Sequence, residues 1–150
     1  MRYESKQYGH LTVTSIAFTV VVLLTTALLV PDFAARVLCA IMALFFVLVG
    51  LLFMTLTVSV EDSQVRISFG VGLIRRQIPI ERIQSASPVL NRWWYGFGIR
   101  KTPHGWMWNI QGLSAVELLY TDGGRFRIGT LDPEGLTAAI TAACKGQAPA

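Results

Sequence analysis

The sequence has 150 residues, room for about one ordinary domain, and 53% of them are hydrophobic whereas only 15% are charged. Soluble domains carry about 25% charged residues, so the composition argues against a wholly soluble chain and favours membrane-spanning segments. The net charge of +4 is carried without a dense stripe of Lys and Arg, so nucleic acid is not an expected partner. Cys39 and Cys144 form no CxxC motif, and we expect neither a bound metal nor a cofactor.

Two long apolar runs stand near the start of the chain. Residues 11–30 and 37–56 are each twenty residues long and contain no charge. A helix of that length spans roughly 30 Å, the thickness of the hydrocarbon core of a bilayer. Pro31 ends the first run and the connection 31–36 is short, so we expect an antiparallel transmembrane hairpin over 11–56. A cleaved signal peptide is the alternative, but its apolar run would be about 7–15 residues and a second run follows here.

The flanking charges predict the orientation of this hairpin. Segment 1–10, expected to be a short N-terminal cytoplasmic segment, contains Arg2 and Lys6 against Glu4, whereas the connection holds one Arg and one Asp. Positive-inside weighting therefore favours a multi-pass protein of the cell (inner) membrane with both termini in the cytoplasm. The basic remainder of the chain agrees, because a positive domain suits an anionic membrane face.

Beyond residue 56 the apolar pattern changes to period two, which is typical of strands with one buried face. The clearest hairpin is predicted around the turn Asp122-Gly123-Gly124. Pro79 indicates a strand edge or end. About seven short strands are expected, at 58–60, 65–71, 73–80, 85–90, 106–110, 115–121 and 125–130, with 95–99 as an additional candidate in the irregular stretch 91–100.

A C-terminal helix is predicted to begin at Asp132. Asp is a good N-cap, Pro133 suits the first helical position, and Glu134 favours the positive end of the helix dipole. Four apolar residues then share one face of the helix: Leu136, Ala139, Ile140 and Ala143. We expect a β domain over 57–144, a partly closed barrel or roll capped by this helix, followed by a tail at 145–150.

Several short features of the chain occur together with the hairpin. They are IPIERI at 78–83, WYGFGIR at 94–100, Gly105-Trp106, and the helix start Asp132-Pro133-Glu134. This combination resembles the bacterial pleckstrin-homology-like (PH-like) membrane proteins, in which a transmembrane hairpin precedes a PH-like domain. The resemblance implies an all-β PH-like barrel with a C-terminal α-helix, but no particular ligand. Eukaryotic PH domains often bind phosphoinositides through a basic first turn, whereas the first turn here, Glu61-Asp62-Ser63, is acidic.

The segment Arg92-Trp93-Trp94-Tyr95 is the strongest candidate contact site. Trp and Tyr favour the headgroup region of a membrane, and Arg can pair with phosphate. The same residues suit a protein-binding hot spot, or alternatively the interior and mouth of a barrel. The basic pairs Arg75-Arg76 and Arg100-Lys101 are further candidates for membrane or partner contact, with solvated strand positions as the alternative.

No motif supplies a nucleophile with its base, a paired acid and base, or a metal cage, and His104 stands alone in a turn. We therefore expect no catalytic residue and no enzyme. The favoured function is a membrane-anchored, non-catalytic PH-like interaction module that binds a protein partner or self-associates at the cytoplasmic membrane face. A domain that binds anionic lipid headgroups is the alternative, and an unrecognised membrane enzyme is less favoured.

Overall fold

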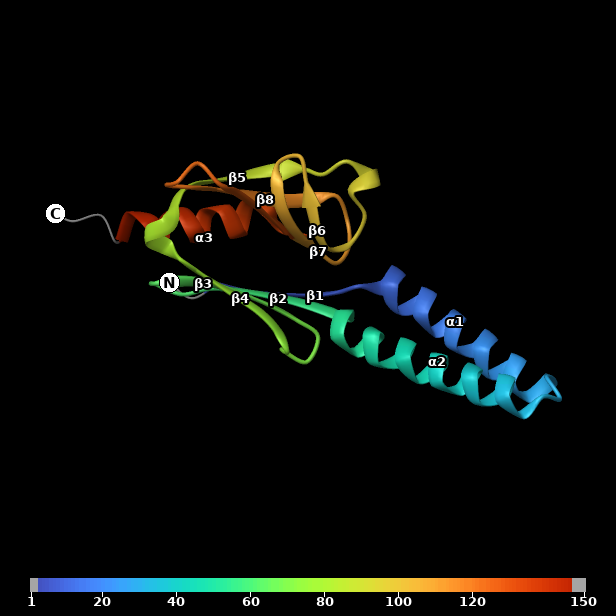
Figure 1. The fold of residues 1–150 in the computed structure, drawn as a ribbon. Coiled ribbons are helices and arrows are strands. Elements are labelled where there is room, and N and C mark those ends of the chain that lie inside the picture. Colours follow the sequence, from blue (N-terminus) through green and yellow to red (C-terminus); the bar gives the residue numbers. More distant parts are fainter. Residues whose placement is uncertain (1–2, 147–150) are drawn as a thin grey trace.

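A helical hairpin projects from one side of a β domain (Figure 1). The structure is a computed structural model that describes residues 3–146. The hairpin consists of α1 (His10–Leu29) and α2 (Phe33–Phe53). Asp32 caps α2 by accepting a hydrogen bond from the amide of Ala35 at 2.8 Å, and Arg36 Nε donates to the carbonyl of Val30 at 2.7 Å. The two charges between the apolar runs therefore close the turn of the hairpin.

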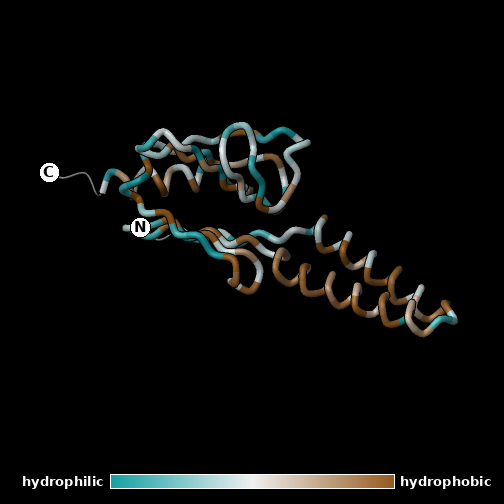
Figure 2. Tube along the Cα trace, in the orientation of Figure 1, coloured by the Kyte–Doolittle hydropathy of each residue, from teal (hydrophilic) through white to brown (hydrophobic). Residues whose placement is uncertain are grey.

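Both helices are long and apolar enough to cross a bilayer, and they bury almost nothing against the protein. Their apolar windows are 0% and 6% buried, and Figure 2 shows hydrophobic residues along both helices, with hydrophilic residues at the turn between them. The hydroxyls on α1 bond back to carbonyls four residues earlier, at Thr14, Ser15, Thr19, Thr25 and Thr26. A helix of a soluble core would hide its apolar side chains in protein, so this exposure favours a lipid environment.

The helices join the β domain through two adjacent strands. β1 (Tyr3–Tyr8) precedes α1, β2 (Thr55–Val60) follows α2, and the two strands pair antiparallel along their full length. A single residue links strand to helix on each side, Gly9 and Met54, and the amide of Gly9 donates to the carbonyl of Met54 at 3.0 Å. The strand ladder is therefore continuous with the helical hairpin.

The sequence predicts no strand within residues 1–10, but six of these residues form β1. Its side chains are mostly polar, so the sequence shows no alternation of apolar residues that would predict a strand here. Gln7 is buried and its Nε2 donates to the carbonyl of Gly129 at 2.9 Å, linking β1 to a strand of the other sheet. The second apolar run is predicted to reach residue 56, but α2 ends at Phe53 because pairing with β1 takes over from Thr55.

The domain contains a four-stranded sheet with the order β1-β2-β3-β4 and a five-stranded sheet with the order β5-β8-β9-β7-β6. The remaining strands are β3 (Gln64–Phe69), β4 (Ile74–Pro79), β5 (Ile83–Leu90), β6 (Gly98–Thr102), β7 (Gly105–Asn109), β8 (Ser114–Tyr120) and β9 (Arg125–Gly129). β8 and β9 form the predicted antiparallel hairpin, whereas β7 pairs parallel to β9. Pro79 does lie at the end of an edge strand, as predicted.

One hydrophobic core lies between the two sheets and α3 (Pro133–Gly146). Asp132 Oδ1 accepts the amide of Gly135 at 2.9 Å as the predicted N-cap, and Leu136 and Ile140 are fully buried. Figure 1 shows α3 between the sheets at the end far from the helical hairpin. Aromatic rings run from α2 into this core in the order Phe53, Phe69, Trp108 and Phe126, with centroids 5.4–6.0 Å apart.

Four expectations about the β domain are wrong. The sheets do not close into a barrel, and the described residues contain nine strands rather than about seven. Val71 is 64% exposed in a turn instead of continuing the alternation of β3, because Gly70 has a positive φ and ends the strand. Residues 95–99 are not one strand: a 3-10 turn, η2 (Trp93–Tyr95), precedes β6. Of the predicted tail 145–150, residues 147–150 lie outside the described residues, and α3 continues to Gly146.

Candidate interaction surface

The segment 91–97 crosses from one edge of the five-stranded sheet to the other, because β5 and β6 occupy opposite edges. Its first residue, Asn91, is buried and its Oδ1 accepts a hydrogen bond from Arg127 Nη1 at 3.1 Å. Arg127 Nε donates to Glu117 Oε2 at 2.7 Å, and both of these charged side chains are largely buried. This triad anchors the start of the crossing segment on the sheet.

The anchored segment presents two tryptophans to the outside. Trp93 is 76% exposed and Trp94 is 56% exposed, with their rings edge to face at 5.7 Å. The Arg92 guanidinium lies 5.0 Å from the Trp94 ring centroid, and the Tyr95 and Trp94 rings are edge to face with centroids 6.3 Å apart. The alternative that these aromatic residues fill the interior of a barrel does not fit Trp93 and Trp94, because they point out of the core.

The turn between β3 and β4 forms a second exposed apolar loop. Val71 and Leu73 are 64% and 74% exposed, and the turn abuts the last turn of α2. A Cβ added to Gly70 would lie 2.2 Å from the carbonyl oxygen of Leu51, so only glycine permits this approach. Figure 1 shows this turn and segment 91–97 on the side of the domain from which the hairpin projects. We call the two loops, residues 70–73 and 92–95, the helix-side rim.

Arg75 and Arg76 are adjacent in sequence but lie on opposite faces of their sheet. Arg75 is exposed on the outer face, where the pairing register places it in one row with Lys6, Thr57 and Ser68. Arg76 turns inward, with its guanidinium 4.5 Å from the ring centroid of Phe126. Only Arg75 is therefore available to an external phosphate.

Arg76 also faces the phenol of Tyr120, which is nearly buried at the inner face of β8. Burial raises the pKa of Tyr120 above its ordinary value of 10.0, and the nearby guanidinium groups of Arg76 and Arg82 oppose this rise. The burial of the phenol therefore outweighs the two cations in setting the direction of the pKa shift.

The side chains of the other basic pair, Arg100 and Lys101, also lie apart. Arg100 lines a cleft between β6 and the helices, and its Nε donates to the carbonyl of Phe97 at 3.0 Å. Lys101 lies opposite Trp106 near the far end of β6 and is exposed. The structure thus brings Arg92, Trp93, Trp94 and Tyr95 together, and places Arg100 behind them and Lys101 elsewhere.

Sequence reasoning missed the residues that hold this surface in place. The signal for the buried ion pair was present, because the predicted hairpin turn at 122–124 sets Glu117 opposite Arg127. Asn91 gave no signal, since it pairs with Arg127 only through the crossing of the sheet. Among residues 3–146, no group of three or more His, Cys, Asp or Glu side chains could hold a metal ion.

The fold and the site together define a helical hairpin that bears an open, two-sheet β domain with an exposed aromatic loop. No protein-family model matches the chain, and no curated protein sequence matches it significantly. The resemblance to PH-like membrane proteins therefore stays a prediction from the sequence.

Proposed function

We propose that the chain is a membrane-anchored, non-catalytic interaction module whose β domain rests on the bilayer through the helix-side rim. The observation that carries this proposal is the exposure of Trp93 and Trp94 on a loop that a buried ion pair anchors. An exposed aromatic pair loses little freedom on binding when its backbone is already fixed. The C-terminal helix and two facing sheets also support a PH-like fold.

The depth of the rim follows from the length of the helices. α1 has 20 residues, which extend over roughly 30 Å, so its first turn lies at the boundary of the hydrocarbon core. The headgroup layer extends roughly 5–7 Å further on each side. Since the two rim loops flank the ends of the helices nearest the domain, their aromatic and apolar side chains lie within reach of this layer. Trp is enriched there because its ring is amphipathic.

The charges near the rim complement an anionic surface. Arg92 lies beside Trp94, and Arg75 shares a row with Lys6 on the outer face of the sheet. Lipid phosphates at the bilayer surface would pair with such guanidinium groups. The proposal therefore includes a preference for anionic lipid, and positive-inside weighting favours a domain on the cytoplasmic side.

The pairing of β1 also supports two spanning helices over a cleaved leader. Cleavage after the first apolar run would remove a strand whose six residues all pair with β2 and would expose the edge of that sheet. The N-terminal strand is therefore part of the domain that the helices anchor.

The test is fluorescence quenching in vesicles that contain phospholipids brominated along the acyl chain. The full chain is compared with the double variant Trp93→Phe, Trp94→Phe, and with the control Trp106→Phe. Trp106 is 47% exposed but lies near the β6–β7 turn, away from the helices. We expect strong quenching in the wild type and the control, and a clear loss in the double variant.

Equal quenching in all three proteins would contradict the proposal. In a second, independent experiment, a photo-crosslinker placed at residue 93 identifies what contacts the loop in native membranes. Lipid adducts support the bilayer contact, whereas a single protein adduct would replace it with a protein-binding hot spot.

A further inference from the structure

We infer that the junction of the helices with the β domain binds one bilayer phospholipid, with an acyl chain in an apolar cleft and the phosphate on Arg100. The cleft has a volume of about 300 Å³. Its walls come from three parts of the chain: Thr12 on α1, Val49 and Phe53 on α2, and Phe97, Ile99 and Arg100 at the start of β6. This site lies behind the aromatic loop and is distinct from the helix-side rim.

The composition of the walls favours a hydrocarbon chain. Val49, Phe53, Phe97 and Ile99 are apolar, and a further wall residue, Ile110, is buried. A volume of about 300 Å³ stands at the lower end of ligand pockets, so it accommodates part of a lipid rather than a whole one. The rest of such a lipid would stay in the bilayer.

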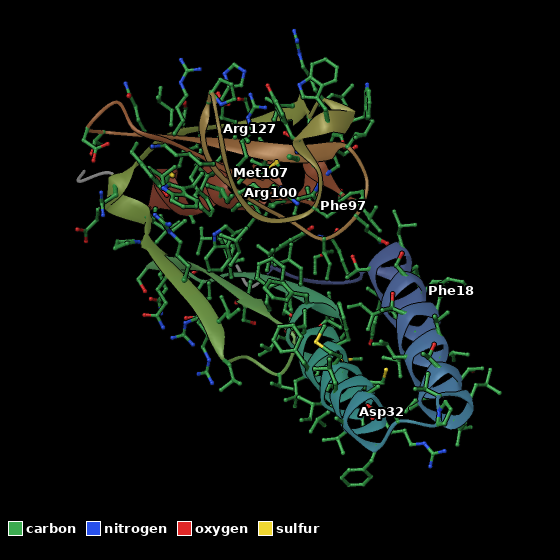
Figure 3. The ribbon with its side chains drawn as sticks, turned by 45° about the vertical axis from the view of Figure 1, so that its right-hand side comes forward. Phe18, Asp32, Phe97, Arg100, Met107 and Arg127 are labelled. Carbon is green, nitrogen blue, oxygen red and sulfur yellow. The ribbon has the colours of Figure 1, made fainter. Side chains whose placement is uncertain are left out.

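The position of the cleft supplies that lipid directly. Thr12 belongs to the first turn of α1 and Phe53 is the last residue of α2, so these wall residues lie at the boundary of the hydrocarbon core if the hairpin spans it. The surface of α1 beside Thr12 is exposed, so the apolar walls continue the lipid-facing surface of the hairpin. Figure 3 shows Phe97 beside the near end of α1.

Arg100 provides the polar end of the site. Its Nε is bonded to the carbonyl of Phe97 at 3.0 Å, which fixes the guanidinium next to the cleft. Within the described residues, its Nη1 and Nη2 groups make no ion pair and no other hydrogen bond. Two N–H groups of one guanidinium match the oxygens of a phosphate, which no diacylglycerol offers.

The experiment measures lipid bound to the full chain by native mass spectrometry in detergent. The probes are dioleoylphosphatidylglycerol, dioleoylglycerol, which lacks the phosphate, and glycerol 1-phosphate, which lacks the chains. Thr12→Trp fills the cleft, and Thr14→Trp is the matched control because Thr14 is exposed on the same helix. Arg100→Gln removes the charge of an exposed side chain, so the fold is retained.

We expect one tightly bound phosphatidylglycerol, weakened about tenfold by Arg100→Gln and at least as much by Thr12→Trp, but unchanged in Thr14→Trp. Binding of phosphatidylglycerol that neither Thr12→Trp nor Arg100→Gln weakens would overturn the inference. Equally tight binding of glycerol 1-phosphate would show an anion site without a chain cleft, and equally tight binding of dioleoylglycerol would show that Arg100 has no part in it; either result overturns it.

The inference shares with the proposed function only the spanning hairpin. The variant Trp93→Phe, Trp94→Phe is expected to retain the bound lipid, because neither residue lines the cleft. If the three proteins were quenched equally but lipid binding in the cleft were retained, only the proposed contact of the rim would be contradicted. If the quenching difference were observed but no lipid bound in the cleft, only the proposed lipid site would be contradicted.

Discussion

The amide of Gly9 donates to the carbonyl of Met54 at 3.0 Å, at the point where two strands become two helices. The last strand pair, Tyr8 opposite Thr55, lies directly beside this bond. The β domain is therefore attached by two short, mutually bonded connections rather than by a flexible linker. Its orientation relative to the hairpin is fixed by the backbone itself.

Gly9→Ala is expected to destabilise this junction by about 1–3 kcal/mol through overpacking. A Cβ at residue 9 would lie 2.7 Å from Cγ1 of Ile110, which is buried. Thermal unfolding of the full chain in detergent measures the effect. Ile110→Ala alone leaves a cavity, but in the double variant the two costs should add to less than their sum. Gly146→Ala is the control, because a Cβ at residue 146 meets nothing within 4 Å. Strict additivity of the two changes, or an equal loss of stability in this control, would contradict the packing argument.

Glu117→Gln is expected to cost about 3–5 kcal/mol, because it leaves the largely buried guanidinium of Arg127 without its counter-ion. The double variant Glu117→Gln, Arg127→Met should be less destabilised than the single one. Arg125 also pairs with Glu117 at 3.5 Å but is half exposed, so Arg125→Gln should change stability by only about 0–1 kcal/mol. The free energy of unfolding and the rate of proteolysis within 91–97 report the loss of the anchor. A single variant as stable as the wild type would contradict it.

Arg75→Ala and Arg76→Ala are expected to separate lipid contact from stability. Arg76→Ala removes the partly buried cation above Phe126 and should lower the stability by about 1–2 kcal/mol. Arg75→Ala should leave stability within about 0.5 kcal/mol, since the side chain is exposed on the outer face. Unfolding in detergent and salt-dependent association with anionic vesicles measure the two properties. Equal effects of both changes on unfolding would contradict the inward position of Arg76.

Tyr120 is expected to make the protein sensitive to alkaline pH. Its folded pKa is raised above 10.0 by burial, so the folded state retains the proton to higher pH than the unfolded state does. This contribution to stability is present below the unfolded pKa and is lost as the pH rises through the folded pKa. Melting temperatures measured from about pH 9 to pH 11 should fall less in Tyr120→Phe than in the wild type.

The pKa of Tyr3 is also raised, chiefly by burial and then by the neighbouring Asp132, so its effect on alkaline stability has the same direction. The double variant Tyr3→Phe, Tyr120→Phe should therefore have the flattest alkaline profile. An unchanged profile in both variants would show that neither phenol is perturbed.

The sequence predicts well those parts of the fold in which apolar residues recur in a regular pattern or a local side chain stabilises a turn or a helix end. The charge-free runs gave the two helices, and the alternation of Val58, Val65 and Ile67 gave buried strand faces. Asp132 and the turn at 122–124 have side chains that stabilise one backbone conformation locally. Such features depend on neighbours in sequence, so no long-range information is needed.

The remaining features depend on contacts between distant segments. β1 is polar and becomes a strand because its backbone completes the edge of β2, and Gln7 is buried because Gly129 accepts its hydrogen bond. Arg75 and Arg76 form one basic pair in the sequence, but successive side chains of β4 point to opposite faces of the sheet, so the two guanidinium groups lie apart. The outward position of Trp93 follows from strand order, since β5 and β6 lie at opposite edges. Periodicity contains none of this information.

The pairing of β1 with β2 has a consequence for the order of assembly. These strands are separated by 46 residues, a closure that costs conformational entropy in a free chain. In the proposed membrane arrangement, the inserted helical hairpin would hold the two strands next to each other, so the helices would take the place of the tight turn of an ordinary β-hairpin. A fragment beginning after α2 lacks the first strand and should not fold as this domain does.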